Sequence, residues 1–239
     1  QTATPWLTER HGYDPTSTGS VLTRAEMRVI ADIAVERGLF VISDEVYREF
    51  TYGCEAMASM LEFEHAHDNV VVIDSVSKRF SACGARVGAL ISRNSGLMKQ
   101  ALKICQARLC AATLDQVGAA ALYSVGPEYF AAVREEYQRR RDTAYAGLMR
   151  IPGVVCRRPE GAFYLMAKLP IDNTDTFQQW MLEEFSDRGE TVMLTPGEGF
   201  YATPGKGVNE ARIAYVLEQD RLERAMELLA LGIEAYNKR

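Results

Sequence analysis

The pattern of apolar and polar residues predicts alternating helices and strands in the first half of the chain. Thr23-Arg-Ala-Glu26 has the form of a capping box, and apolar residues recur at helical spacing from there to Gly38. Apolar runs at residues 39–43, 70–74 and 87–92 predict short strands. A helix followed by a wholly apolar strand is typical of a parallel sheet whose two faces are covered.

The second half of the chain has a different order of predicted helices and strands. Helices are predicted at residues 95–109, 114–124, 127–150, 175–188 and from 220 onward, and further strands at 154–156, 162–169, 191–195 and 211–217. We therefore predict an α/β fold in two domains. Residues 1–145 would hold part of a parallel sheet and end in a long linking helix, and residues 146–239 would form a smaller α+β domain.

Composition and charge exclude several classes of function. The 239 residues are 47% hydrophobic and 25% charged, with a net charge of −5 and scattered cations, which gives no argument for nucleic acid binding. No apolar run approaches the roughly 20 residues that span a bilayer, so we expect no membrane contact and a cytoplasmic protein. The five cysteines are widely spaced and the three histidines lie in polar stretches, so neither a metal site nor a catalytic triad is predicted.

Candidate chemistry follows the strand at residues 70–74. Lys78 stands there among the small hydroxyls of Ser75 and Ser77, and Arg86 comes shortly after with a planar fork suited to a phosphate group. This set fits a phosphorylated cofactor held beside a reactive amine. The alternative interpretation is a solvent-exposed lysine at a strand end, because hydroxyl-rich loops are common.

Asp44 and Tyr47 follow the preceding strand. Because the carboxyl ends of parallel strands meet at one edge of a sheet, we expect them to lie near Lys78. An aldehyde cofactor needs an amine for a Schiff base, a carboxylate for its ring nitrogen and a cation for its phosphate. Asp44, Lys78 and Arg86 supply these three types. Alone, Asp44 would be interpreted as a turn carboxylate and Tyr47 as a core residue.

Four motifs in order now resemble a known family, the class I/II aminotransferases, which are fold-type I pyridoxal phosphate enzymes. The motifs are Ser43-Asp-Glu-Val-Tyr47, Ser75-Val-Ser-Lys-Arg-Phe-Ser-Ala-Cys-Gly-Ala-Arg-Val-Gly88, Arg158-Pro-Glu-Gly-Ala-Phe-Tyr164 and Ala211-Arg-Ile-Ala-Tyr215. The resemblance extends from residue 14 to about residue 236 and is greatest to bacterial aspartate aminotransferases.

The resemblance implies a role for each candidate residue toward pyridoxal 5'-phosphate. Lys78 would form the imine with the cofactor and carry the proton in the reaction. Asp44 would pair with the pyridine nitrogen, and Tyr47 would hydrogen-bond the phenolic oxygen. The phosphate would be held by three residues: Ser75, Ser77 and Arg86.

On the substrate side, the resemblance implies that Arg212 binds the α-carboxylate as a bidentate fork. Gly161, Phe163 and Tyr164 either line the pocket or pack in the core. The implied reaction moves an amino group between an acidic, aspartate-like amino acid and a 2-oxo acid, and the implied assembly is a homodimer.

The sequence departs from the family pattern in two ways. Thr16-Ser-Thr-Gly19 stands where the family has Asn-Pro-Thr-Gly, so threonine replaces the asparagine that bonds the cofactor ring oxygen. The chain also resembles only the C-terminal portion of such an enzyme, and we expect it to be a truncated form. Two alternatives stay open: a non-catalytic homologue that associates with another chain, and a pyridoxal phosphate-dependent lyase or decarboxylase.

Overall fold

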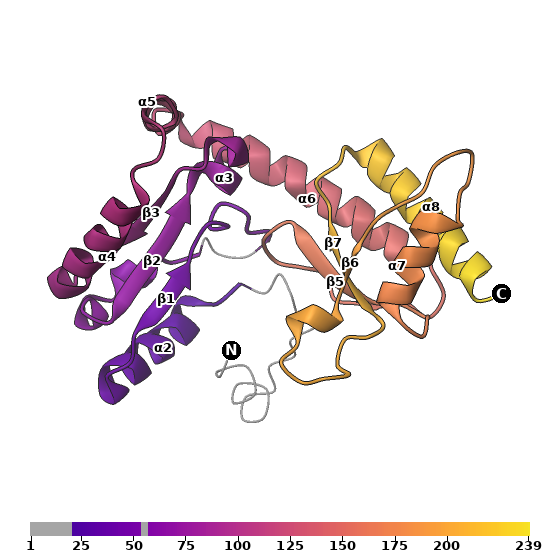
Figure 1. Ribbon diagram of the computed structural model, residues 1–239, viewed down its shortest axis with the longest axis horizontal. Coiled ribbons are helices and arrows are strands. Elements are labelled where there is room, and N and C mark those ends of the chain that lie inside the picture. Colours follow the sequence, from indigo (N-terminus) through magenta and orange to yellow (C-terminus); the bar gives the residue numbers. More distant parts are fainter. Residues whose placement is uncertain (1–20, 54–56) are drawn as a thin grey trace. The chain divides into compact units, whose positions relative to one another are not determined.

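A computed structural model describes residues 21–53 and 57–239, so Thr16 lies outside the described residues. The described chain forms two compact units, residues 21–134 and residues 135–239 (Figure 1). The change from one unit to the other falls inside the long helix α6 (Pro127–Met149). The division at residues 145/146 stays a prediction. None of the helices in the described ranges is long and apolar enough to cross a membrane.

The first unit is built on a three-stranded sheet of order β1-β2-β3 (Figure 1). The strands are β1 (Val41–Asp44), β2 (Val70–Ser75) and β3 (Gly88–Ile91). β1 and β2 are parallel, as predicted, whereas β3 runs antiparallel to β2 and makes the sheet mixed. The ends of β1 and β2 and the start of β3 therefore lie at one edge of the sheet, with Ser75 opposite Gly88.

The three helices predicted in this unit are present as α2 (Arg24–Arg37), α4 (Ser95–Arg108) and α5 (Thr113–Leu122). Four short helices were not predicted: η1 (Met60–Glu62), η2 (Glu64–Ala66), α3 (Val76–Arg79) and η3 (Cys83–Ala85). The capping box of α2 is confirmed, because Thr23 and Glu26 exchange side-chain and backbone hydrogen bonds. Gly38 ends the helix with φ 61°, a left-handed conformation that glycine adopts without strain.

One apolar cluster joins α2 to the sheet. Met27 and Ala31 of the helix pack with Val70 and Val72 of β2, together with Met60, Phe63 and Ala66 from the short helices. A smaller cluster of Val76, Phe80 and Ala119 joins α3 to α5. These two clusters hold the ends of β1 and β2, because the elements that follow both strands contribute to them.

The second unit contains a four-stranded antiparallel sheet of order β4-β5-β7-β6. Its elements after α6 are β4 (Val155–Cys156), β5 (Tyr164–Lys168), α7 (Thr174–Glu183), β6 (Thr195–Pro196), η4 (Glu198–Phe200), β7 (Glu210–Ala214) and α8 (Gln219–Tyr236). The helix predicted from residue 220 onward is present as α8, and its Leu222, Met226 and Leu229 are buried.

Two predictions in this unit were wrong in extent. The helix predicted at 175–188 ends at Glu183, and only Thr195 of the strand predicted at 191–195 is in a strand. Two hydrogen bonds between α7 and the segment after it replace the predicted strand pairing. Gln178 Oε1 accepts from the N–H of Leu194 at 2.6 Å, and Thr191 Oγ1 donates to the Met181 carbonyl at 2.8 Å.

Candidate functional site

Asp44 closes β1 at the edge where β2 also ends. Asp44 lies opposite Ile73 of β2 in the parallel pair, and Ile73 is two residues before Ser75. Its Oδ1 accepts from the backbone N–H of Val46 at 3.2 Å, which fixes the carboxylate in a turn. The side chain is exposed, and Oδ2 makes no hydrogen bond to any residue that the structure describes. One carboxylate oxygen therefore remains for a ligand.

Lys78 lies in the short helix α3 directly after β2, where the sequence predicted a loop. Ser75 is the N-cap of that helix, and its Oγ accepts from the N–H of Ser77 at 3.0 Å. Lys78 is half-buried, and its Nζ lies 5.8 Å from the centroid of the Tyr47 ring. The structure thus brings the predicted amine and the predicted phenol together at one sheet edge.

Two arginines follow Lys78 in different environments. Arg79 is almost buried and is paired, with Nη2 at 2.7 Å from Asp74 and Nε at 3.6 Å from Glu49. Arg86 is exposed, and its backbone is left-handed at φ 55°, a conformation that is uncommon outside glycine.

Arg86 keeps its charge available. Its Nη1 donates to the Cys83 carbonyl at 3.0 Å, and it forms no ion pair within residues 21–53 and 57–239. Of the two arginines, Arg86 is therefore the cation that can meet an anionic ligand.

The sequence analysis missed Glu45, a buried carboxylate beside Asp44. Glu45 is 1% exposed, and its Oε1 accepts from the N–H of Met60 at 2.9 Å and from the hydroxyls of Ser59 and Ser43 at 3.1 and 3.2 Å. Its Oε2 has no hydrogen bond, although Arg48 Nη1 lies 3.6 Å away. Glu45 therefore ties the turn after β1 to η1. The consecutive acids that follow an apolar strand were the available signal.

Arg212 lies in the second unit, whereas Asp44 and Lys78 belong to the first. It is half-buried in β7, opposite Met166 of β5 and Thr195 of β6. Its Cζ is 4.6 Å from the ring centroids of both Tyr164 and Phe200. No acidic partner for Arg212 is found in the described part of the chain.

Tyr164 is thus in contact with a predicted substrate-binding residue, while Phe163 has a packing role. Phe163 is buried, and its ring lies 5.5 Å from that of Tyr137 and 4.9 Å from that of Tyr164. Gly161 is buried as well. Phe200 was not predicted from the sequence, and only its place in a glycine-rich loop marked it.

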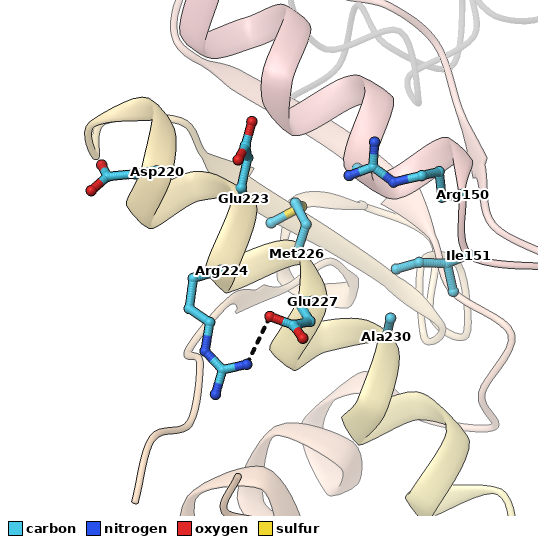
Figure 2. A pocket seen from close by; sticks show the side chains of 9 residues that line it. Arg150, Ile151, Asp220, Glu223, Arg224, Met226, Glu227 and Ala230 are labelled. Atoms are coloured by element: carbon cyan, nitrogen blue, oxygen red, sulfur yellow. Dashed lines mark hydrogen bonds and ion pairs between the residues drawn. The ribbon is translucent and has the colours of Figure 1, made fainter. Parts of the chain in front are cut away.

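A pocket of about 550 Å³ in the second unit lies away from the predicted site residues (Figure 2). It is lined by the end of α6 and by one side of α8. Figure 2 shows acids and arginines around it, with Arg224 bonded to Glu227. Arg224 also reaches Asp187 and Glu190, and these hydrogen bonds raise its pKa further. Arg224 and Glu227 of this pocket are thus paired within the chain.

Comparison with known proteins finds aminotransferases among the relatives of this chain. The chain is 29% identical over 228 residues to the aspartate aminotransferase of Bacillus subtilis. The matched region covers 92% of this chain and 56% of the relative. It is 31% identical over 220 residues to a probable aspartate/prephenate aminotransferase of Aquifex aeolicus, covering 91% and 55%. The chain spans about half the length of the curated relatives it matches.

Solved structures agree with these relatives. An aromatic aminotransferase from Pyrococcus horikoshii superposes with a TM-score of 0.79 at 28% identity, covering 92% of this chain and 58% of that one. LysN, an α-aminoadipate aminotransferase from Thermus thermophilus solved with a phosphopyridoxyl-leucine adduct, gives 0.78 at 25%, covering 89% and 55%. A family model described as aminotransferase class I and II matches residues 16–229. The chain therefore belongs to the class I and II aminotransferase family.

Proposed function

We propose that this chain carries the cofactor-binding lysine and the substrate-binding arginine of a pyridoxal phosphate-dependent aminotransferase. The observation that carries the proposal is the single sheet edge at which β1 and β2 end. Asp44 presents an open carboxylate oxygen there, and Lys78 lies on the helix that follows the neighbouring strand, with its amine 5.8 Å from the Tyr47 ring.

The donor set of the first unit fits pyridoxal phosphate. That cofactor has an aldehyde, a basic ring nitrogen, a phenolic oxygen and a phosphate, and it supplies an electron sink for the charge left when a proton leaves the substrate. Lys78, Asp44 and Tyr47 match the first three groups. Ser75, Ser77 and Arg86 match the phosphate, since Arg79 is already paired with Asp74.

Each residue then has a defined task. Lys78 Nζ would hold the cofactor through its aldehyde carbon, with the aldehyde oxygen leaving as water, and the amine released by substrate would accept the proton from the substrate Cα. Asp44 holds the positive charge on the ring nitrogen, and Tyr47 donates to the phenolic oxygen. Arg212 binds the substrate α-carboxylate through two parallel N–H groups, because a guanidinium matches a carboxylate in shape as well as charge.

For the substrate we propose an acidic amino acid such as aspartate, with a 2-oxo acid as acceptor. The names of the Bacillus subtilis and Aquifex aeolicus relatives support this choice. We also propose a homodimer, as the family resemblance implies.

Borohydride reduction tests the role of Lys78. The purified chain is mixed with pyridoxal phosphate, reduced, digested and analysed by mass spectrometry. We expect the adduct on Lys78 at a stoichiometric level, and its loss in Lys78→Ala but not in Lys99→Ala, which changes an exposed lysine of α4. Equal labelling of Lys78 and Lys99 would contradict the proposal.

Amino transfer is then measured with aspartate and 2-oxoglutarate. Keto-acid formation that depends on Lys78 supports the aminotransferase, and release of ammonia or carbon dioxide would instead identify a lyase. An adduct on Lys78 without turnover of any amino acid would contradict the catalytic proposal and favour a non-catalytic homologue.

A further inference from the structure

Arg212 differs from the ion-paired arginines of the second unit. Arg224 bonds three acids, and Arg158 and Arg141 share Asp142. In contrast, Arg212 contacts aromatic faces and forms no ion pair or hydrogen bond through its guanidinium to any residue in the described part of the chain. A half-buried guanidinium with no acid partner retains its full capacity to donate to an anion.

The two rings come from different elements. Tyr164 is in β5, two positions before Met166, which pairs with Arg212, so both side chains are on the same face of the sheet. Phe200 is the last residue of η4, in the loop that joins β6 to β7. Each ring centroid lies 4.6 Å from Cζ of Arg212, within cation–π distance.

The segment that carries Phe200 is fixed to the start of β7. Gly197 donates its N–H to the Glu210 carbonyl at 2.7 Å, and a Cβ at Gly197 would come within 2.7 Å of that same oxygen. Tyr201 donates its hydroxyl to the Glu210 carboxylate. The residues on either side of Phe200 are therefore both bonded to Glu210, which is two positions before Arg212.

We propose that Tyr164 and Phe200 form an aromatic clamp that positions Arg212 as a preformed carboxylate receptor. Rings against the guanidinium restrict its rotation and leave the in-plane N–H edge for the ligand, so a carboxylate is bound side-on and in one orientation. Tyr164 and Phe200 are then positioning residues, which act through Arg212. That the carboxylate belongs to the substrate rests on the proposed function.

Nuclear magnetic resonance of the arginine side chains tests the clamp without cofactor. The Nε–Hε signal of Arg212, assigned by its loss in Arg212→Lys, is followed while the full chain is titrated with succinate. We expect a saturable shift, and a dissociation constant raised about 2- to 30-fold in Phe200→Leu and in Tyr164→Leu. Phe200 is 51% exposed, so its replacement should leave the fold intact. Phe200→Tyr keeps the ring and should restore the affinity.

Trp180→Leu is the matched control. Arg239 lies over the rings of Trp180 and Tyr236 at 5.3 and 3.7 Å, so this variant removes one of two rings from an arginine of the same unit. We expect unchanged succinate affinity. In the Arg212→Lys background, where the Arg212 signal is absent, succinate affinity is measured by isothermal titration calorimetry. Phe200→Leu should not change it further there, because the clamp acts only through the guanidinium.

Three results would overturn the clamp: no shift of the Arg212 signal with succinate, unchanged affinity in Phe200→Leu, or equal losses in Phe200→Leu and Trp180→Leu. The Lys78 experiment is independent. If no adduct forms on Lys78 but the Arg212 signal still responds to succinate as expected, the proposed function is rejected and the clamp is kept. If the adduct forms on Lys78 but the succinate response fails, only the clamp is rejected.

Discussion

Two neighbouring acids at the end of β1, Asp44 and Glu45, have opposite environments. Successive side chains of a strand point to opposite faces, so Asp44 is exposed at the sheet edge while Glu45 is buried and accepts three hydrogen bonds at one oxygen. A buried carboxylate is tolerated only when donors surround it. Glu45 therefore stabilises the turn that carries Asp44 and Tyr47.

Removing the Glu45 carboxylate should destabilise the chain. In Glu45→Ala the N–H of Met60 and the hydroxyl of Ser59 lose their buried acceptor, which costs about 1–3 kcal/mol of the free energy of unfolding. Glu45→Gln retains an acceptor oxygen and should lose less. Urea unfolding followed by circular dichroism measures both, with exposed Glu64→Ala as the control. Equal losses in Glu45→Ala and Glu45→Gln would show that these hydrogen bonds contribute little.

Burial also controls the reactivity of one cysteine. It raises the pKa of the Cys156 thiol to about 11, so the reactive thiolate is scarce at neutral pH. Cys83, Cys105 and Cys110 are exposed. Iodoacetamide labelling read by mass spectrometry should modify Cys156 last at pH 8, with its labelling rate rising about tenfold per pH unit until pH 11. Labelling of Cys156 at the rate of Cys105 at pH 8 would contradict this.

At the scale of elements, local signals predicted those helices whose ends are set by nearby residues. The capping box of α2 and the proline that starts α6 are examples. Prediction failed where a side chain distant in sequence accepts the backbone hydrogen bond that a strand partner would otherwise accept, as Gln178 does from the N–H of Leu194. A bond between residues 16 positions apart leaves no local pattern in the sequence.

Loss of the α2 cap should weaken the first unit. Thr23→Ala removes the acceptor for the Glu26 N–H at 3.2 Å and should lower the free energy of unfolding by about 0.5–2 kcal/mol. Ser95→Ala is the control, because Asn94 and not Ser95 caps α4. Thermal unfolding compares them, and equal shifts in Tm would contradict a specific role for the cap.

The same cap predicts a pH dependence. The backbone N–H of Thr23, followed by its hydroxyl, holds the pKa of Glu26 below its ordinary value of 4.5. Because the folded-state pKa is lowered, the stabilisation is present above about pH 4.5 and disappears as the pH falls through the lowered value. A carbon-detected titration of Glu26 should show an upward pKa shift in Thr23→Ala.

For the whole molecule, the order of the main elements was predictable, because it depends on apolar runs and on the residues that end them. The roles of the site residues stay predictions. Lys78 and Tyr47 do lie together. The antiparallel direction of β3 was not predictable, since a short apolar run has the same composition in either direction. The contacts of Phe200 with Arg212 were also hidden, because they depend on loop packing.

The described parts of the two units should differ in local stability. α4 buries none of its residues, whereas α8 buries seven, including Leu222, Leu229 and Tyr236. Few buried contacts lower the free energy of local opening. Hydrogen exchange measured by mass spectrometry should therefore show α4 amides exchanging well before α8 amides. Equal protection of both helices would contradict this expectation.

Gly197 has a consequence for sequence variation that reaches beyond its own loop. A side chain there would strike Glu210, whereas a Cβ at Gly199 has no atom within 4 Å. In a library randomised at both codons and selected for carboxylate binding, deep sequencing should recover glycine at position 197 and many residues at position 199. Free variation at position 197 among the selected clones would show that the placement of Phe200 tolerates a displaced loop.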